Sequence, residues 1–204
     1  MYDSSDFKKT YQNLSNGELV DFARHKSKNL RKEAVLVLKQ EIESRGLDSG
    51  LVKWVDTESN KFEGAERSSL INRIRNLRCP RCDSAKDKLF GFEINYIYSY
   101  LISCNHVRKE KILCRSCGSI EKLKAIATTF FTGWWSEEGF FITFVTLSKD
   151  TVNFLFTSKI SDGVFDRFVT KNTGFLRRRG TEIKTLENLI LKQNRIETPD
   201  ENDL

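Results

Sequence analysis

The sequence predicts an α+β fold in which a central β-hairpin lies between an N-terminal helical hairpin and a mainly helical, aromatic-rich C-terminal half. Three observations predict it: apolar residues at helical spacing near both ends, a run of aromatic and β-branched residues in the middle, and two Cys-x2-Cys pairs that bracket this run. With 204 residues, 39% of them hydrophobic, the composition is typical of globular proteins.

Residues 1–47 are expected to form the N-terminal helical hairpin. Apolar side chains recur at helical spacing in two stretches between residues 14 and 42. Ser15 followed by Glu18 is a capping-box pattern, in which the serine hydroxyl accepts a hydrogen bond from the third helical N–H and the glutamate reaches back. Gly46 is expected to end the second helix in a left-handed conformation.

Residues 48–78 are expected to be a linker followed by an amphipathic helix. Small and polar residues dominate positions 48–69, which we interpret as a domain boundary. Leu70, Ile74 and Leu77 then fall on one helical face, and this helix leads into the first cysteine pair.

The two cysteine pairs are the most specific chemical signal in the chain. Each Cys-x2-Cys segment delivers two thiolates from one short turn, and the 31 residues between the pairs let the chain fold back once, so that four soft ligands meet. This spacing predicts a structural Zn²⁺ in a zinc ribbon over residues 79–124. The expected ligands are Cys79, Cys82, Cys114 and Cys117.

A redox dithiol at Cys79 and Cys82 is the alternative interpretation, because the first thiolate of such a pair can act as a nucleophile. A redox Cys-x2-Cys normally opens a helix in a βαβ setting, and it would leave the second pair unexplained. The pattern therefore favours zinc.

The hairpin is expected between the two pairs, with strands over residues 89–103 and 107–113 and the reversal near Asn105 and His106. Two pairs already complete a four-coordinate site, so we expect Cys104 to be a small buried residue and His106 a loop residue.

The apolar C-terminal part, residues 125–196, holds ten of the fifteen phenylalanines and two of the three tryptophans between residues 130 and 175. Its uncharged stretches, 125–136 and 139–148, are shorter than the ~20 residues that cross a bilayer, so we predict no spanning helix. Residues 140–157 fit both a helical and a strand period, so whether residues 125–157 are helical or extended stays open.

Two further helices are expected near the C-terminus. Ser161 can cap the first, with Asn172 and Gly174 as its stop, and Thr181 can cap the second. Residues 197–204 form an acidic tail that we expect to be frayed.

The net charge and the cysteine content limit which cellular compartment and which partners we expect. The formal charge is +6, from 34 basic and 28 acidic residues, a modest excess that permits an anionic partner. Free cysteines without an evident cleavable signal segment indicate a reducing compartment, so we expect the cytoplasm or the inner face of its membrane. The local basic clusters have a simpler interpretation as solvated surfaces and a functional interpretation as anion contacts. They consist of Arg73, Arg75, Arg78, Arg81, Arg177, Arg178 and Arg179.

Two segments resemble known families. The order of Cys-x2-Cys, hairpin, Cys-x2-Cys, an apolar stretch with Gly133-Trp134-Trp135 and a later helix resembles uncharacterised bacterial zinc-ribbon proteins that associate with membranes, over roughly residues 79–190. That resemblance implies that the four cysteines bind metal and that the apolar segment is helical. Glu137 and Glu138 depart from the family, whose members tend to be apolar there. Residues 14–46 resemble a short helical module appended to varied bacterial proteins.

No catalytic constellation stands out in the sequence. The two histidines, His25 and His106, have no protease-like spacing, and no phosphate-binding loop is present, so we expect a non-enzyme. We expect a zinc-ribbon scaffold or adaptor for protein contacts, with a place at the cytoplasmic membrane surface.

The residues of this scaffold that would contact a membrane or a partner are aromatic side chains of the apolar segment, although packing in a core is the simpler role for them. They are Phe130, Phe131, Trp134, Trp135, Phe140 and Phe141. The alternative function is nucleic-acid binding through the basic residues, with bases stacking on Tyr96, Tyr98 and Tyr100.

Overall fold

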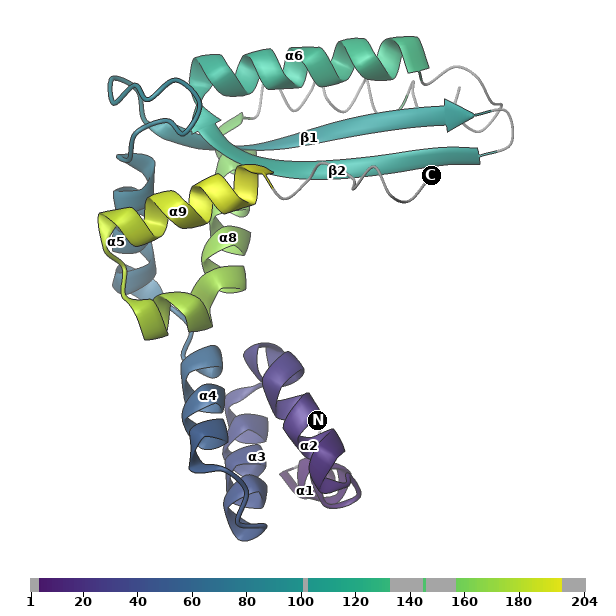
Figure 1. Ribbon diagram of the computed structural model, residues 1–204, viewed down its shortest axis with the longest axis vertical. Helices are drawn as coiled ribbons and strands as arrows, with labels where there is room; N and C mark the ends of the chain where they lie inside the picture. Colours follow the sequence, from purple (N-terminus) through teal and green to yellow (C-terminus); the bar gives the residue numbers. More distant parts are fainter. Residues whose placement is uncertain (1–3, 101–102, 133–144, 146–156, 196–204) are drawn as a thin grey trace. The chain divides into compact units, whose positions relative to one another are not determined.

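The computed structural model describes residues 4–100, 103–132, 145 and 157–195, and the chain is α+β (Figure 1). It divides into two compact units: a first unit of residues 1–67 and 169–181, and a hairpin unit of residues 68–168 and 182–204. The helices α5 (Gly64–Arg75) and α8 (Thr157–Arg179) contribute residues to both.

Four α-helices make the core of the first unit: α1 (Ser4–Gln12), α2 (Asn16–Lys26), α3 (Lys32–Ser44) and α4 (Ser49–Ser59), with the 3-10 turn η1 (Ser27–Asn29) between α2 and α3. Their shared core is apolar and is built from one face of each helix. It consists of Tyr11, Leu19, Ala23, Val35, Leu38, Ile42, Leu51 and Val55.

The predicted helix signals at α2 and α3 are confirmed. Ser15 accepts from the N–H of Glu18 at 3.3 Å, and Glu18 accepts from the N–H of Ser15 at 2.8 Å, which is a complete capping box. Gly46 has φ +61°, and the N–H of Leu47 donates to the carbonyl of Ile42 at 3.1 Å, as in a Schellman ending of α3.

Two predictions for the N-terminal part need correction. The expected hairpin of two helices has an additional helix, α1, before it, and part of the expected polar linker forms α4. Residues 49–59, expected to belong to the linker, form α4, because Leu51 and Val55 share one helical face and bury it in the core of the first unit. Asp48 caps this helix by accepting from the N–H of Gly50 at 2.9 Å.

The hairpin unit is built on an antiparallel pair, β1 (Leu89–Tyr100) and β2 (Ser103–Cys114). The register pairs Leu89 with Cys114 and Tyr100 with Ser103, so the chain reverses between Tyr100 and Ser103. The predicted reversal near Asn105 and His106 was wrong by a few residues, because both lie within β2. The side chains of residues 97–106, Cys104 and His106 included, lie outside the described part.

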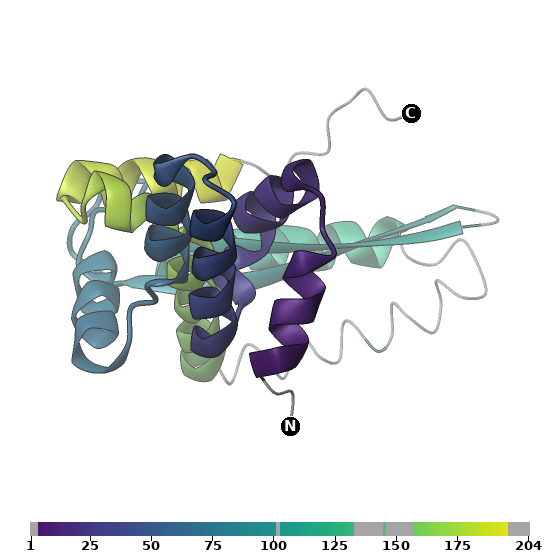
Figure 2. The same ribbon diagram turned by 90° about the horizontal axis from the view of Figure 1, so that it is seen from below.

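Three helices pack against the hairpin: α6 (Arg115–Thr132), α8 and α9 (Ile183–Arg195). Figures 1 and 2 both show α6 lying along the hairpin. Gly118 in α6 faces the ring of Phe92 with no room for a Cβ atom, and the Asn194 side chain of α9 bonds both backbone groups of Ile112 in β2.

The predicted start and stop of the helix near Ser161 were both wrong. Ser161 lies inside α8, where its hydroxyl accepts from the N–H of Gly91 at 2.9 Å, and Gly91 has no room for a Cβ beside Val164. The helix continues through Gly174, which lies against the Glu58 carboxylate, and it ends before Gly180 at φ +82°.

The region left open between helix and strand is settled only where the structure describes it. Residues 125–132 are helical, as the end of α6, whereas residues 133–144 and 146–156 lie outside the described residues. Within the described part of the chain, no helix is long and apolar enough to cross a membrane.

Candidate metal centre

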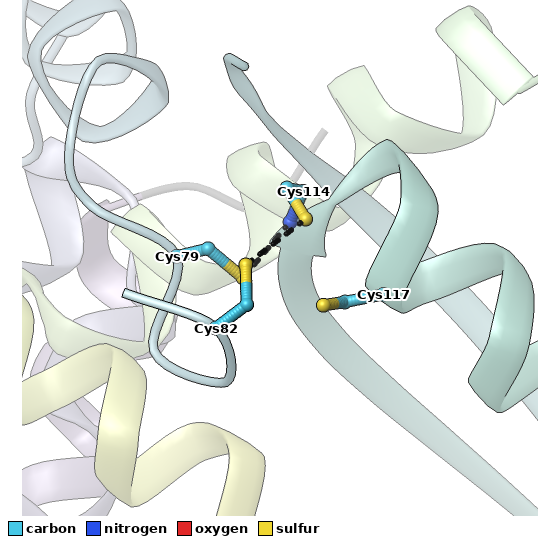
Figure 3. Close-up of side chains that lie close together, drawn as sticks. All are labelled: Cys79, Cys82, Cys114 and Cys117. Carbon is cyan, nitrogen blue, oxygen red and sulfur yellow. Dashed lines mark hydrogen bonds between the residues drawn. The ribbon is translucent and has the colours of Figure 1, made fainter. Parts of the chain in front are cut away.

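The four cysteines predicted as ligands come together at one end of the hairpin, and their sulfur atoms all lie within 4.8 Å of one another (Figure 3). The first pair belongs to the loop between α5 and β1. Cys114 is the last residue of β2, and Cys117 lies in the first turn of α6. The second pair is therefore a strand end joined to a helix start, and only the first is a loop turn.

The four sulfur atoms lie close enough together to share one metal ion. A tetrahedron with zinc–sulfur bonds of ~2.3 Å has sulfur–sulfur edges of ~3.8 Å. The Sγ atoms of Cys82 and Cys114 are 3.7 Å apart, and all four cysteines are free thiols. Three of the four are buried and Cys82 is exposed, so a bound ion would be largely shielded from water. A closed set of four sulfurs suits a structural ion and leaves no coordination position for a substrate.

The first cysteine turn is fixed by its own backbone. The N–H of Asp83 donates to the carbonyl of Cys79 at 2.8 Å, and the N–H of Cys79 donates to the carbonyl of Ser84 at 3.0 Å. Asp83 has φ +53°, and it is the one non-glycine residue in the left-handed region among the described residues. This conformation turns the chain back sharply after Cys82, so that both sulfurs of the pair face the same point (Figure 3).

Backbone hydrogen bonds prepare one sulfur for ionisation. Burial opposes the charge on Cys79, but N–H groups of Cys114, Arg81 and Cys82 outweigh it and lower the pKa of Cys79 to about 7. The N–H of Cys114 lies 3.4 Å from this sulfur. Burial raises the pKa of Cys114 and of Cys117. A metal that binds here at neutral pH must therefore displace protons.

A charged clasp links the two cysteine turns. Arg81, between the cysteines of the first pair, donates to the Glu121 carboxylate at 2.7 Å and to the carbonyl of Cys117 at 3.4 Å. Lys111 of β2 donates to the other oxygen of Glu121 at 2.8 Å. Glu121 lies one helical turn after Cys117, so the clasp of Arg81, Glu121 and Lys111 joins the first turn, α6 and β2 around the metal centre.

The redox alternative finds little support in this geometry. The first pair lies in a loop and opens no helix, whereas a redox Cys-x2-Cys normally does. The second pair converges on the same point and completes a metal site, which a redox pair would not need.

Most of the arginines predicted as anion contacts pair with carboxylates. Arg75 pairs with Asp162, Arg78 with Asp83, Arg81 with Glu121, Arg177 with Glu66 and Arg178 with Glu58. Arg73 also has an interaction partner. Arg179 is exposed and has no ion pair among the described residues. The structure does not bring this set together into one cationic surface within either unit.

The aromatic residues predicted as contacts fall into two groups. Phe130 and Phe131 are exposed near the end of α6, with their rings 5.6 Å apart and edge to face. Trp134, Trp135, Phe140 and Phe141 lie outside the described residues.

Sequence reasoning missed two features that the structure reveals. The first is the clasp, whose only local signal is the spacing of Glu121 four residues after Cys117. The second is a group of basic residues between positions 24 and 32, signalled by five cations in nine residues without an acidic one.

No protein-family model matches this chain, and comparisons with curated proteins and with solved structures give no match.

Proposed function

We propose that this chain is a non-catalytic zinc-ribbon scaffold that presents one apolar helix face to a partner protein. The observation that carries the proposal is the convergence of four cysteine sulfurs within 4.8 Å at the point where β2 passes into α6. A zinc ion held there would fix the start of α6 against the hairpin and so orient the whole helix.

The apolar face of α6 supports the contact role. Ile120, Leu123, Phe130 and Phe131 lie within about 100° of arc on this helix, which spans the width of one helix face. All four are exposed, Leu123 to 67% and Phe131 to 73%. The opposite side of α6, with Ala125, is buried. Exposed apolar residues that form a contiguous stripe are typical of interaction surfaces, whereas scattered ones are not.

The chemistry of the site supports a cytoplasmic location. Four thiols that must stay reduced to bind zinc suit the cytoplasm, and we propose that the scaffold works there, at or near the inner face of the membrane. The resemblance to membrane-associated bacterial zinc-ribbon proteins is consistent with this placement. The pairing of most ribbon arginines with carboxylates disfavours nucleic-acid binding through those arginines.

A site-specific photo-crosslinking experiment tests the contact face. A photoreactive residue is placed at Leu123 in the full-length chain in cells, and at Leu36, a similarly exposed leucine of α3 in the first unit, as the matched control. The proposal expects one discrete protein adduct at position 123, absent at position 36 and lost when Cys114 is replaced by serine. Lipid adducts alone, or equal labelling at both positions, would refute a protein-binding face.

A further inference from the structure

Positive charge is dense at one corner of the first unit, where five cations fall within the nine residues 24–32. No aspartate or glutamate interrupts this stretch. Residues 67–81 also hold five cations and no acidic residue, but there Arg75, Arg78 and Arg81 pair with carboxylates. We name the first stretch the basic corner, and it consists of Arg24, His25, Lys26, Lys28, Arg31 and Lys32.

The basic corner lies where the end of α2, η1 and the start of α3 meet, and four of its five permanent cations are exposed, with Lys28 half-buried. Within the described part of the chain, its one ion pair joins Lys32 to Glu63 at 3.6 Å. The two side chains are 87% and 64% exposed, so this pair contributes little to stability. Arg24, Lys28 and Arg31 have no ion pair among the described residues. The chain thus neutralises most of its other arginines and leaves these cations uncompensated.

Two of these cations lie at the N-terminus of α3, where their charge destabilises the helix. Arg31 is the N-cap of α3 and gives no side-chain cap, and Lys32 is its first residue. The N-terminus of a helix carries partial positive charge, so cations there are unfavourable. In the same unit, α2 and α4 begin with Ser15 and Asp48, which do cap their helices. Helix stability therefore gives no reason for Arg31 and Lys32, whereas Arg24 and Lys26 lie in the last turn of α2, where cations are favourable.

We propose that the basic corner binds the phosphate backbone of duplex nucleic acid, without reading its sequence. Phosphates complement both the cations and the unpaired backbone N–H groups in the first turn of α3. The two described aromatic side chains that adjoin the corner are already engaged, which disfavours stacking of single-stranded bases. Trp54 donates to the carbonyl of Arg24 at 3.3 Å and carries the Arg178 guanidinium over its ring at 4.1 Å. Phe22 packs against the ring of Tyr11 and lies beneath the ammonium group of Lys26.

A duplex fits this surface better than a lipid bilayer does. Stable membrane attachment by a basic patch needs an apolar or acyl anchor beside it. Among the described residues of the first unit, Leu36 on α3 and Phe175 on α8 are the exposed large apolar side chains, and two such residues on different helices make a weak anchor. The proposal goes beyond the scaffold function and depends neither on zinc nor on the α6 face.

The test measures binding of the full-length chain to a mixed-sequence DNA duplex at several salt concentrations. The double variant Lys28→Gln, Arg31→Ser removes two cations of the corner, and its serine is a favourable N-cap, so the melting temperature should not fall. The control, Lys8→Gln, Lys9→Gln, removes two exposed cations of α1 in the same unit. The net charge of the two double variants is the same.

If all five cations contact phosphates, the slope of log K against log salt is about −4.5, and each lost contact reduces its magnitude by about one. The corner variant should lose roughly two in slope and about 10- to 100-fold in affinity at 0.1 M salt, whereas the control should stay within about twofold. Equal losses in both double variants would overturn the assignment to this corner. Absence of duplex binding at low salt, tighter binding to single strands, or retention only by vesicles of anionic lipid would overturn the partner.

Discussion

Replacing Glu121 with glutamine should weaken zinc binding about tenfold without changing any metal ligand. The carboxylate of Glu121 is 17% exposed and accepts from Arg81 at 2.7 Å and from Lys111 at 2.8 Å. Hydrogen bonds to charged groups contribute ~1.5 to 3 kcal/mol each when shielded from water. Arg81 is 37% exposed, so solvent screens part of this, and roughly 1 to 2 kcal/mol remains for the clasp. Without the clasp, the binding of zinc must itself order the two cysteine-containing segments. The affinity of the chain for zinc should therefore fall by about 5- to 30-fold.

Competition of the reduced chain with a chromophoric zinc chelator measures this affinity. The matched control is Glu187→Gln on α9, because Glu187 lines a cavity of about 420 Å³ beside Cys79 and has no ion pair among the described residues. The control should bind zinc as the parent chain does. An affinity of Glu121→Gln within twofold of the parent would refute the clasp.

The same variant has a defined pH signature. The hydrogen bond from Lys111 lowers the pKa of Glu121 below its ordinary value of 4.5, and the charges of Lys111 and Arg81 add to this. A carboxyl group whose pKa is lowered by folding stabilises the fold above its unfolded pKa, and it loses this effect as pH falls through the folded value. In the zinc-free reduced chain, the difference in unfolding free energy between the parent and Glu121→Gln should be constant near neutral pH and shrink below about pH 4.5. A difference that does not begin to shrink as pH falls below 4.5 would contradict an ionic clasp.

Three other perturbations follow from the same structure. Zinc binding at pH 7 should release more than one proton per ion, because the pKa of Cys79 is about 7 and that of Cys117 is raised; calorimetry in two buffers of different ionisation enthalpy measures this, and release of less than one would contradict it. Gly118→Ala should lower the free energy of unfolding by about 1 to 3 kcal/mol, since the new methyl group meets the ring of Phe92, and an unchanged urea midpoint would show that α6 can shift freely. Arg45→Ala should cost about 2 to 3 kcal/mol because its guanidinium donates to three backbone carbonyls around the end of α1, and lysine there should not restore the loss; full rescue by lysine would reduce its role to charge.

The sequence predicts those parts of the fold whose signals are local. The Ser15 capping box, the left-handed Gly46 and the β-branched run of the hairpin are each decided within a few residues, and all three are confirmed. The four cysteines were placed together because their spacing leaves the chain one simple way to converge, and their sulfurs do converge.

The missed parts depend on contacts between distant residues. Ser161 resembles a helix cap in the sequence, but its hydroxyl accepts from the N–H of Gly91, 70 residues away, and the helix runs through it. Gly174 resembles a helix stop, yet it allows α8 to approach Glu58. Arg81 and Glu121 lie 40 residues apart, and the spacing of Glu121 after Cys117 does not name Arg81 as its partner.

The metal content of the purified, reduced full-length chain tests the central claim most directly. Elemental analysis together with thermal melting should show one zinc ion per chain, and it should show both loss of that ion and a lower melting temperature in Cys114→Ser. A chain that contains no stoichiometric metal after purification and zinc addition, or that melts at the same temperature with serine at this position, would contradict the account.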